Sequence, residues 1–160
     1  MQFRQGVSDL EDFLSAWGRD MLQRGFTIET SKDAPSTYQE LRALREFSPA
    51  KIIVYNGGCD NTIFSQSVYN HLFRAFHDFG HLSHGLDFQF KNEITLGERQ
   101  ANEVYDAVLP TIGLERANVV RQIIRAEIIG QIEYYQIHRR YIDDQKTYVI
   151  GYLGVEGGIK

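Results

Sequence analysis

The sequence predicts an all-α or α-dominated α+β fold, a helical bundle with a small two-strand accessory. Most long segments repeat their apolar residues with the 3.6-residue period of a helix, and only one short run, residues 51–55, is strongly strand-like. The chain has 160 residues, 42% of them hydrophobic and 24% charged, with no internal repeat and no linker. We therefore expect residues 1–160 to form one helical domain.

The first third of the chain contains two predicted helices. Ser8 and Glu11 have the spacing of a capping box before an amphipathic run, and Gly25 is placed to stop that helix. Thr37 and Glu40 repeat the capping pattern at the start of the second helix. The two predicted strands that flank this second helix are residues 26–29 and residues 51–55, the latter ended by Asn56-Gly57-Gly58.

The rest of the chain is predicted to be helical almost throughout. A helix follows Asn61-Thr62 and ends near His84 before Gly85, and the next runs over residues 92–109 and stops at Pro110. Residues 114–141 are apolar on nearly every side, which indicates a central buried helix. Asp143 and Asp144 are placed to cap a last short helix through Tyr152.

Composition narrows the classes of partner. The net charge is −4 and the pI is about 5.7, which argues against the broad basic face that nucleic acid or anionic lipid requires. A small-molecule substrate remains compatible with this charge. Cys59 is the only cysteine, so no internal disulfide can form, and neither a signal pattern nor a membrane-spanning apolar run is visible. We expect a cytoplasmic protein with no membrane or nucleic-acid partner.

Histidines cluster in the helix that ends near Gly85. At 100° per residue, His77, His81 and His84 project within about 60° of one another, and a His pair at positions i and i+4 can hold one metal ion. Asp78 lies beside them, as a further ligand or as the carboxylate that orients an imidazole. The alternative is an amphipathic helix whose histidines form a solvated outer face. His71 points elsewhere.

Two later helices can supply carboxylates to these histidines. Glu93 falls among small and apolar residues of its helix, on the same face as Gln100, and Glu127 lies in line with Gln131 on an apolar stripe of the central helix. A carboxylate on an apolar face is unfavourable unless it is paired, protonated or bound to metal. We therefore predict a metal site formed by His77, His81, Glu93 and Glu127, which suits zinc, manganese or iron. The alternatives are a buried Glu–Arg pair, with Arg74, Arg121 or Arg125, or a partly solvated helix edge.

Residues from His77 to Glu93 resemble known motifs. His77-Asp78-x-x-His81, followed by eleven residues and Glu93, is similar to the HDxxH-x11-E zinc motif of a helical family in coenzyme Q biosynthesis. The stretch from Phe73 also resembles tailed-phage proteins with an FRAxHDxxGH motif, here one residue shorter, and Glu127 to Gln131 resembles their later Glu-x-x-Gly-Gln. The resemblance implies His77, Asp78, His81 and Glu93 as metal-site residues, Glu127 as the candidate from the central helix, and host cytoplasm if the chain is phage-encoded.

The leading hypothesis is a metal-dependent hydrolase or lyase that acts on a small metabolite or nucleotide, with Glu127 as ligand or base and Asp78 orienting a histidine. One alternative is a phage-type interaction or sequestering protein whose metal is structural or absent. A second is a phosphohydrolase similar to the HD-domain family, with His77-Asp78 as the pair and Asp143 or Asp144 as the distal acid. Nucleophilic catalysis by Cys59, in a Gly-Gly-Cys-Asp loop without an identifiable His partner, is a further alternative.

Overall fold

The computed structural model describes residues 2–154, and it is α-dominated as the sequence predicts. Its helices are α1 (Gln2–Gln23), α2 (Tyr38–Phe47), α3 (Ser67–His84), α4 (Phe90–Ile112), α5 (Leu114–Arg125), the π-helical segment η1 (Ala126–Gly130), α6 (Gln131–His138) and α7 (Gln145–Tyr152). Strands β1 (Thr27–Ser31) and β2 (Lys51–Tyr55) form one parallel pair, with Ile28 opposite Ile52.

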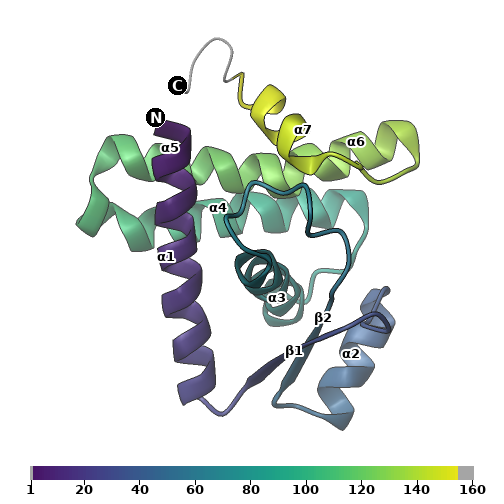
Figure 1. Ribbon diagram of the computed structural model, residues 1–160. Helices are drawn as coiled ribbons and strands as arrows, with labels where there is room; N and C mark the ends of the chain where they lie inside the picture. The colour runs from purple at the N-terminus through teal and green to yellow at the C-terminus, as the bar shows by residue number, and fades with distance from the viewer. Residues whose placement is uncertain (1, 155–160) are drawn as a thin grey trace.

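The helices around α4 form the body of the molecule (Figure 1). The continuous run α5–η1–α6 lies alongside α4, α1 crosses this pair, and α3 lies beneath it. The two strands and α2 form a β–α–β unit at one side, where β2 packs on α3. The main core joins apolar side chains of α1, α3, α4 and α5, with Leu10, Phe76, Val104 and Ile123 among its buried members. As a result, the His-bearing helix α3 is held between α1, α4 and the strands.

Several predicted ends agree with the structure. Strand β2 has the predicted bounds, and the capping box of Thr37 and Glu40 is present at the start of α2. Gly85 ends α3 in the left-handed conformation, with φ at 63°, and the carboxylate of Asp144 accepts from the backbone of Thr147 at the start of α7. These ends depend on the chemistry of neighbouring side chains, which can be recognised from the local sequence.

The predicted start of the first helix was wrong. Helix α1 extends back to Gln2, so Ser8 lies inside it and is exposed. Glu11 does not complete a cap, because its carboxylate accepts a 2.7 Å hydrogen bond from the backbone N–H of Ser65. The bond lies in the segment before α3, whose residues 62–64 are buried, and α3 begins at Ser67 rather than directly after Thr62.

The predicted ends of the two central helices were also wrong. Pro110 lies within the last turn of α4, where its missing N–H removes one backbone hydrogen bond, and the helix ends at Ile112 before Gly113 with φ at 81°. The long helix predicted for residues 114–141 ends at His138 because Arg139 is left-handed. It is interrupted by the π-helical segment Ala126–Gly130, all of whose residues are buried.

No helix among the described residues is both long and apolar enough to cross a membrane.

Candidate metal centre

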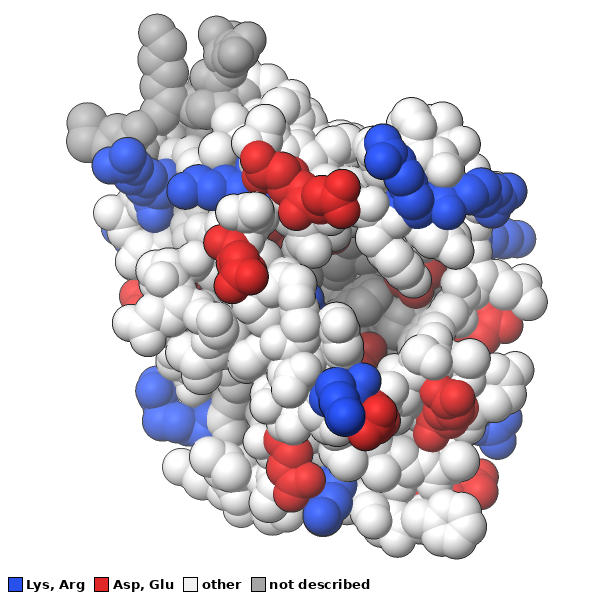
Figure 2. Space-filling model, turned by 45° about the vertical axis from the view of Figure 1, so that its right-hand side comes forward, with Lys and Arg blue, Asp and Glu red and all other residues white. Residues whose placement is uncertain are grey.

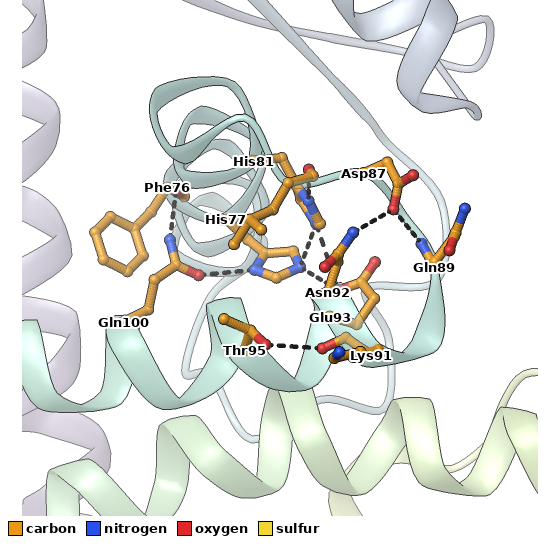
Figure 3. Close-up of polar contacts among 11 residues, drawn as sticks. Phe76, His77, His81, Asp87, Gln89, Lys91, Asn92, Glu93, Thr95 and Gln100 are labelled. Carbon is orange, nitrogen blue, oxygen red and sulfur yellow. Dashed lines mark hydrogen bonds and ion pairs between the residues drawn. The ribbon is translucent and has the colours of Figure 1, made fainter.

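The candidate site lies where the end of α3 meets the start of α4. His77 and His81 are one turn apart on α3, and Glu93 lies in the first turn of α4. The short connection between the two helices starts with the αL turn at Gly85, and the backbone N–H of Leu86 donates back to the carbonyl of His81. This tight reversal brings Glu93 across from the two histidines, as Figure 3 shows.

In each imidazole, Nδ1 points away from the other ring and lies beside a hydrogen-bond acceptor. Nδ1 of His77 lies 2.8 Å from Oε1 of Gln100, and Nδ1 of His81 lies 2.7 Å from the carbonyl oxygen of Leu86. The orientation of the Gln100 amide is fixed, because its Nε2 donates to the carbonyl of Phe76 at 2.9 Å (Figure 3). Both Nδ1 atoms must therefore carry a hydrogen, and in the neutral rings both Nε2 atoms carry a lone pair.

These two lone pairs and a carboxylate oxygen point to one spot. Nε2 of His77 and Nε2 of His81 are 3.1 Å apart, and Oε2 of Glu93 lies 3.0 Å from the first and 3.4 Å from the second. Ligand atoms about 2.0–2.1 Å from a tetrahedral ion are separated by about 3.3 Å. The three donors thus have the spacing of three corners of a tetrahedral site, and they form a group able to hold a metal ion.

Burial and hydrogen bonding together set the protonation of the side chains in this cluster. His81 is fully buried, so a solvated outer face is the wrong description of this histidine. Burial alone would raise the pKa of Glu93, but hydrogen bonds and charge from His77 and His81 outweigh it and lower the pKa to about 2. Burial opposes protonation of His77, yet Glu93 and Gln100 together raise its pKa. Without a metal, the cluster is therefore an anion beside a ring that gains a proton readily.

Asp78 stands next to this cluster rather than in it. Burial raises its pKa to about 6, against the opposing charges of His77 and His81. The positions that orient the imidazoles are held by Gln100 and the Leu86 carbonyl, and among residues 2–154 no hydrogen bond joins Asp78 to either ring. Gln100 was not singled out as a site residue from the sequence. Its signal was an amide on a buried face that it shares with Glu93, and Gly80 opposite it leaves room for its side chain.

Glu127 reaches the same region from the π-helical segment. It is 7% exposed, its Oε2 accepts a 2.8 Å hydrogen bond from Nε2 of Gln131, and its buried Oε1 has no hydrogen-bond partner within the described part of the chain. Burial raises its pKa to about 8, against the charge of Arg74 and the bond from Gln131. Glu127 is not one of the three clustered donors. The sequence placed Glu127 on the correct face but gave no sign of the π-helical turn, a feature that is frequent at functional sites.

His77, Glu93 and Glu127 line one pocket of about 300 Å³. Figure 2 shows the surface hollowed on this side of the molecule, with acidic residues inside the hollow. Arg74 also lines the pocket, and its Nη1 donates to backbone carbonyls of Tyr55 and Gly57 rather than to a carboxylate. The remaining wall combines amide, phenol and apolar groups from Asn70, Phe73, Ile128, Gln131, Ile132, Tyr135, Tyr141 and Gln145.

The other candidates from the sequence lie apart from this centre. His84 is exposed and contacts Arg99, and Asp144 caps α7. Arg125 pairs with Glu98 at 2.9 Å, and no ion pair of Glu127 with an arginine is found in residues 2–154. His71 lies beside Cys59. The upstream histidine and distal acid of an HD-type centre therefore do not join His77 and Asp78 in the described fold.

Comparison of the chain with protein-family models, with curated proteins and with solved structures finds no match.

Proposed function

We propose that this protein is a metal-dependent enzyme, a hydrolase or lyase for a small metabolite or nucleotide. His77, His81 and Glu93 hold one divalent ion, zinc, manganese or iron, at the inner wall of the pocket. Glu127, where the π-helical segment lines the same pocket, carries a proton. The observation that carries the proposal is the triangle of His77 Nε2, His81 Nε2 and Glu93 Oε2, with sides of 3.0 to 3.4 Å.

A metal ion explains this triangle better than a hydrogen-bonded cluster does. Two lone pairs that face each other at 3.1 Å repel unless a cation or a proton lies between them. A single proton bridges one pair of these atoms, whereas a metal ion satisfies all three donors together. Two imidazoles and one carboxylate also make up the protein ligands of several catalytic zinc sites, in which a further position stays open.

The pocket supports an enzymatic role for such an ion. His77 and Glu93 both line it, so an ion that they hold is reachable from the pocket, where it would act as a Lewis acid. Glu127, with its pKa near 8, holds a proton at neutral pH and can return it to a leaving group. The volume of about 300 Å³ fits a small ligand, and Arg74 offers a positive charge to an anionic one.

Metal content tests the first half of the proposal. Protein purified without a His-tag should contain close to one zinc, manganese or iron per chain by elemental analysis. The matched variant His84→Gln changes an exposed histidine of the same helix, and its metal content should equal that of the wild type. Less than about a fifth of an equivalent, not restored by adding any of the three metals, would contradict the proposal.

Coordination chemistry tests the second half. We expect the visible spectrum of the cobalt(II)-substituted protein to change when azide or inorganic phosphate is added, because an open position accepts an anion. An unchanged spectrum would favour the alternative of an interaction protein with a structural metal. That alternative draws on the position of the cluster, which joins the end of α3 to the start of α4, and it predicts that chelation unfolds the domain.

A further inference from the structure

A second group of reactive side chains lies at the loop that follows β2. Sγ of Cys59 is 3.3 Å from Nε2 of His71 on α3, a contact that the sequence did not identify. The thiol is half-buried, and its loop neighbours Gly58 and Asp60 are exposed. A thiol and an imidazole within hydrogen-bond reach are the two parts of an activated cysteine nucleophile.

The environment of His71 suits it to act as a base. Nε2 is the ring nitrogen that faces the sulfur, and it can accept a proton when the hydrogen of the neutral ring is on Nδ1. Partial burial and the nearby charge of Arg74 lower the pKa of His71, which keeps the ring neutral near pH 7. A neutral imidazole is the form in which histidine deprotonates a nucleophile.

One further side chain contacts the sulfur, and another holds the loop that carries it. Nδ2 of Asn70, a buried residue, donates to Sγ of Cys59 at 3.4 Å. The loop itself is clamped by Arg74, whose guanidinium bonds the Gly57 carbonyl at 2.7 Å, and it turns at Gly58 with φ at +67°, a conformation that favours glycine. The thiol is therefore positioned by α3 and not merely carried on an open loop.

We propose that Cys59 and His71 form a second reactive site, which accepts acyl groups from small esters or thioesters. In this reaction the Sγ proton moves to Nε2 of His71, and Sγ attacks the carbonyl carbon to form an S–C bond. The bond from that carbon to the ester oxygen or thioester sulfur then breaks, and His71 returns the proton to the departing group. The products are an S-acylated Cys59 and a free alcohol or thiol.

An acyl donor is the class of electrophile that fits these groups. Alkylation by an alkyl halide uses only a thiolate, whereas acyl transfer is accelerated by a proton donor for the leaving group and by a hydrogen-bond donor to the carbonyl oxygen. His71 supplies the first. The amide of Asn70, which already lies beside the sulfur, supplies the second. Neither Cys59 nor His71 belongs to the ligand cluster or lines its pocket, whereas Asn70 and Arg74 lie between the two sites and also line that pocket.

p-Nitrophenyl acetate is a suitable probe, used on the full chain after treatment with EDTA so that the metal centre is silent. The wild type should release a burst of one p-nitrophenolate per chain, and intact mass should show one acetyl group, mapped to Cys59 by peptide digestion. His71→Gln should slow this step by about tenfold or more, because the base is lost. The matched control His138→Gln, at an exposed histidine of α6, should react like the wild type.

The reference rate is that of a synthetic peptide covering residues 55–63, which contains the same cysteine without α3. Acetylation of Cys59 in the folded wild type no faster than in this peptide would overturn the proposal, whatever His71→Gln does. Equal rates for folded wild type and folded His71→Gln, with folding checked by circular dichroism, would also overturn it. Metal content and the cobalt spectrum are unaffected by either result, so this proposal and that of the metal enzyme fail separately.

Discussion

Two walls of the pocket each contain a glutamate, and the pKa of one carboxyl is lowered while that of the other is raised. On the α3–α4 wall, Glu93 accepts from two imidazoles, and its pKa falls to about 2 despite its burial. On the π-helical wall, Glu127 has only the amide of Gln131, one oxygen is left without a partner in the described structure, and its pKa rises to about 8. Burial is common to both carboxylates, so the difference arises from the partners that each one finds.

This difference assigns separate chemical capacities to the two acids. An ionised carboxylate beside two imidazoles is suited to hold a cation, and a protonated one in an apolar turn is suited to give and take a proton near neutral pH. Opposed pKa values around one pocket are frequent at catalytic sites. Each acid has a supporting glutamine that can be replaced, since Gln100 orients His77 beside Glu93 and Gln131 bonds Glu127.

The largest expected effect comes from Glu127→Gln in metal-free protein. Between the ordinary pKa of 4.5 and the folded value of about 8, only the unfolded chain loses the Glu127 proton, so the wild type is destabilised as pH rises. The variant has no titrating group at this position and lacks this destabilisation. The difference in free energy of unfolding, variant minus wild type, should therefore increase by about 1.4 kcal/mol per pH unit, or by about 4 kcal/mol between pH 5 and pH 8.

Urea denaturation at several pH values, with a chelator present, measures this gain. Glu103→Gln, an exposed glutamate of α4, is the control and should stay within about 0.5 kcal/mol of the wild type throughout. A difference between Glu127→Gln and the wild type that does not vary with pH would mean that Glu127 is ionised and solvated. The contrast between the two walls would then be lost.

On the other wall, Glu93→Gln should weaken metal binding. The amide keeps the shape of the side chain but removes the charge that faces the two Nε2 atoms. Because loss of a mere supporting residue weakens metal sites by about 10- to 100-fold, loss of a ligand should raise the dissociation constant for zinc at least about a hundredfold. Competition with a chromogenic chelator measures the constant, and His84→Gln is the control on α3. Equal affinities of the wild type and Glu93→Gln would remove Glu93 from the centre.

The sequence predicted one wall better than the other. The spacing of His77, His81 and Glu93 follows from helical periodicity and a short connection, which are local properties, and the structure brings all three together. It also predicted the faces of Glu93 and Glu127 correctly, since a carboxylate in an apolar stripe is visible in any amphipathic pattern. The same pattern did not reveal that the two acids have opposite pKa shifts, because it records burial and not hydrogen-bond partners.

The missed features depend on tertiary contacts. Gln100 orients His77 because Gly80 leaves space for its amide, and Cys59 meets His71 because Arg74 clamps a loop that follows β2. The π-helical turn at Glu127 lies in a segment whose composition is that of an ordinary helix. The pattern at Ser8 and Glu11 led to the reverse error. It matches a capping box, but Ser8 lies inside α1 and Glu11 accepts from the distant backbone N–H of Ser65.

A smaller effect is expected from Gln100→Leu on the α3–α4 wall. Leucine fills a similar volume at this buried position but cannot accept from Nδ1 of His77, so the ring is free to turn or to move its proton to Nε2. The dissociation constant for zinc should rise about tenfold, by chelator competition, while Glu127 still dominates the pH dependence of stability. An unchanged constant in the folded variant would show that His77 needs no such partner.

The smallest expected effect comes from the corresponding glutamine of the other wall, in Gln131→Leu. The bond from Gln131 is one of the two influences that lower the pKa of Glu127, so its loss should move that pKa further above 8. Since one hydrogen bond contributes about 1 kcal/mol net, the move should be about one unit or less. The decline in stability with pH should therefore continue above pH 8 in metal-free protein, and zinc affinity should change by less than about threefold, because Gln131 touches no member of the ligand triangle.

Urea denaturation between pH 7 and pH 9.5 measures the first quantity, with Gln136→Leu on the exposed side of α6 as the control. A loss of zinc affinity as large as that of Gln100→Leu would mean that Glu127 is itself a ligand, and the two walls would then form one metal site.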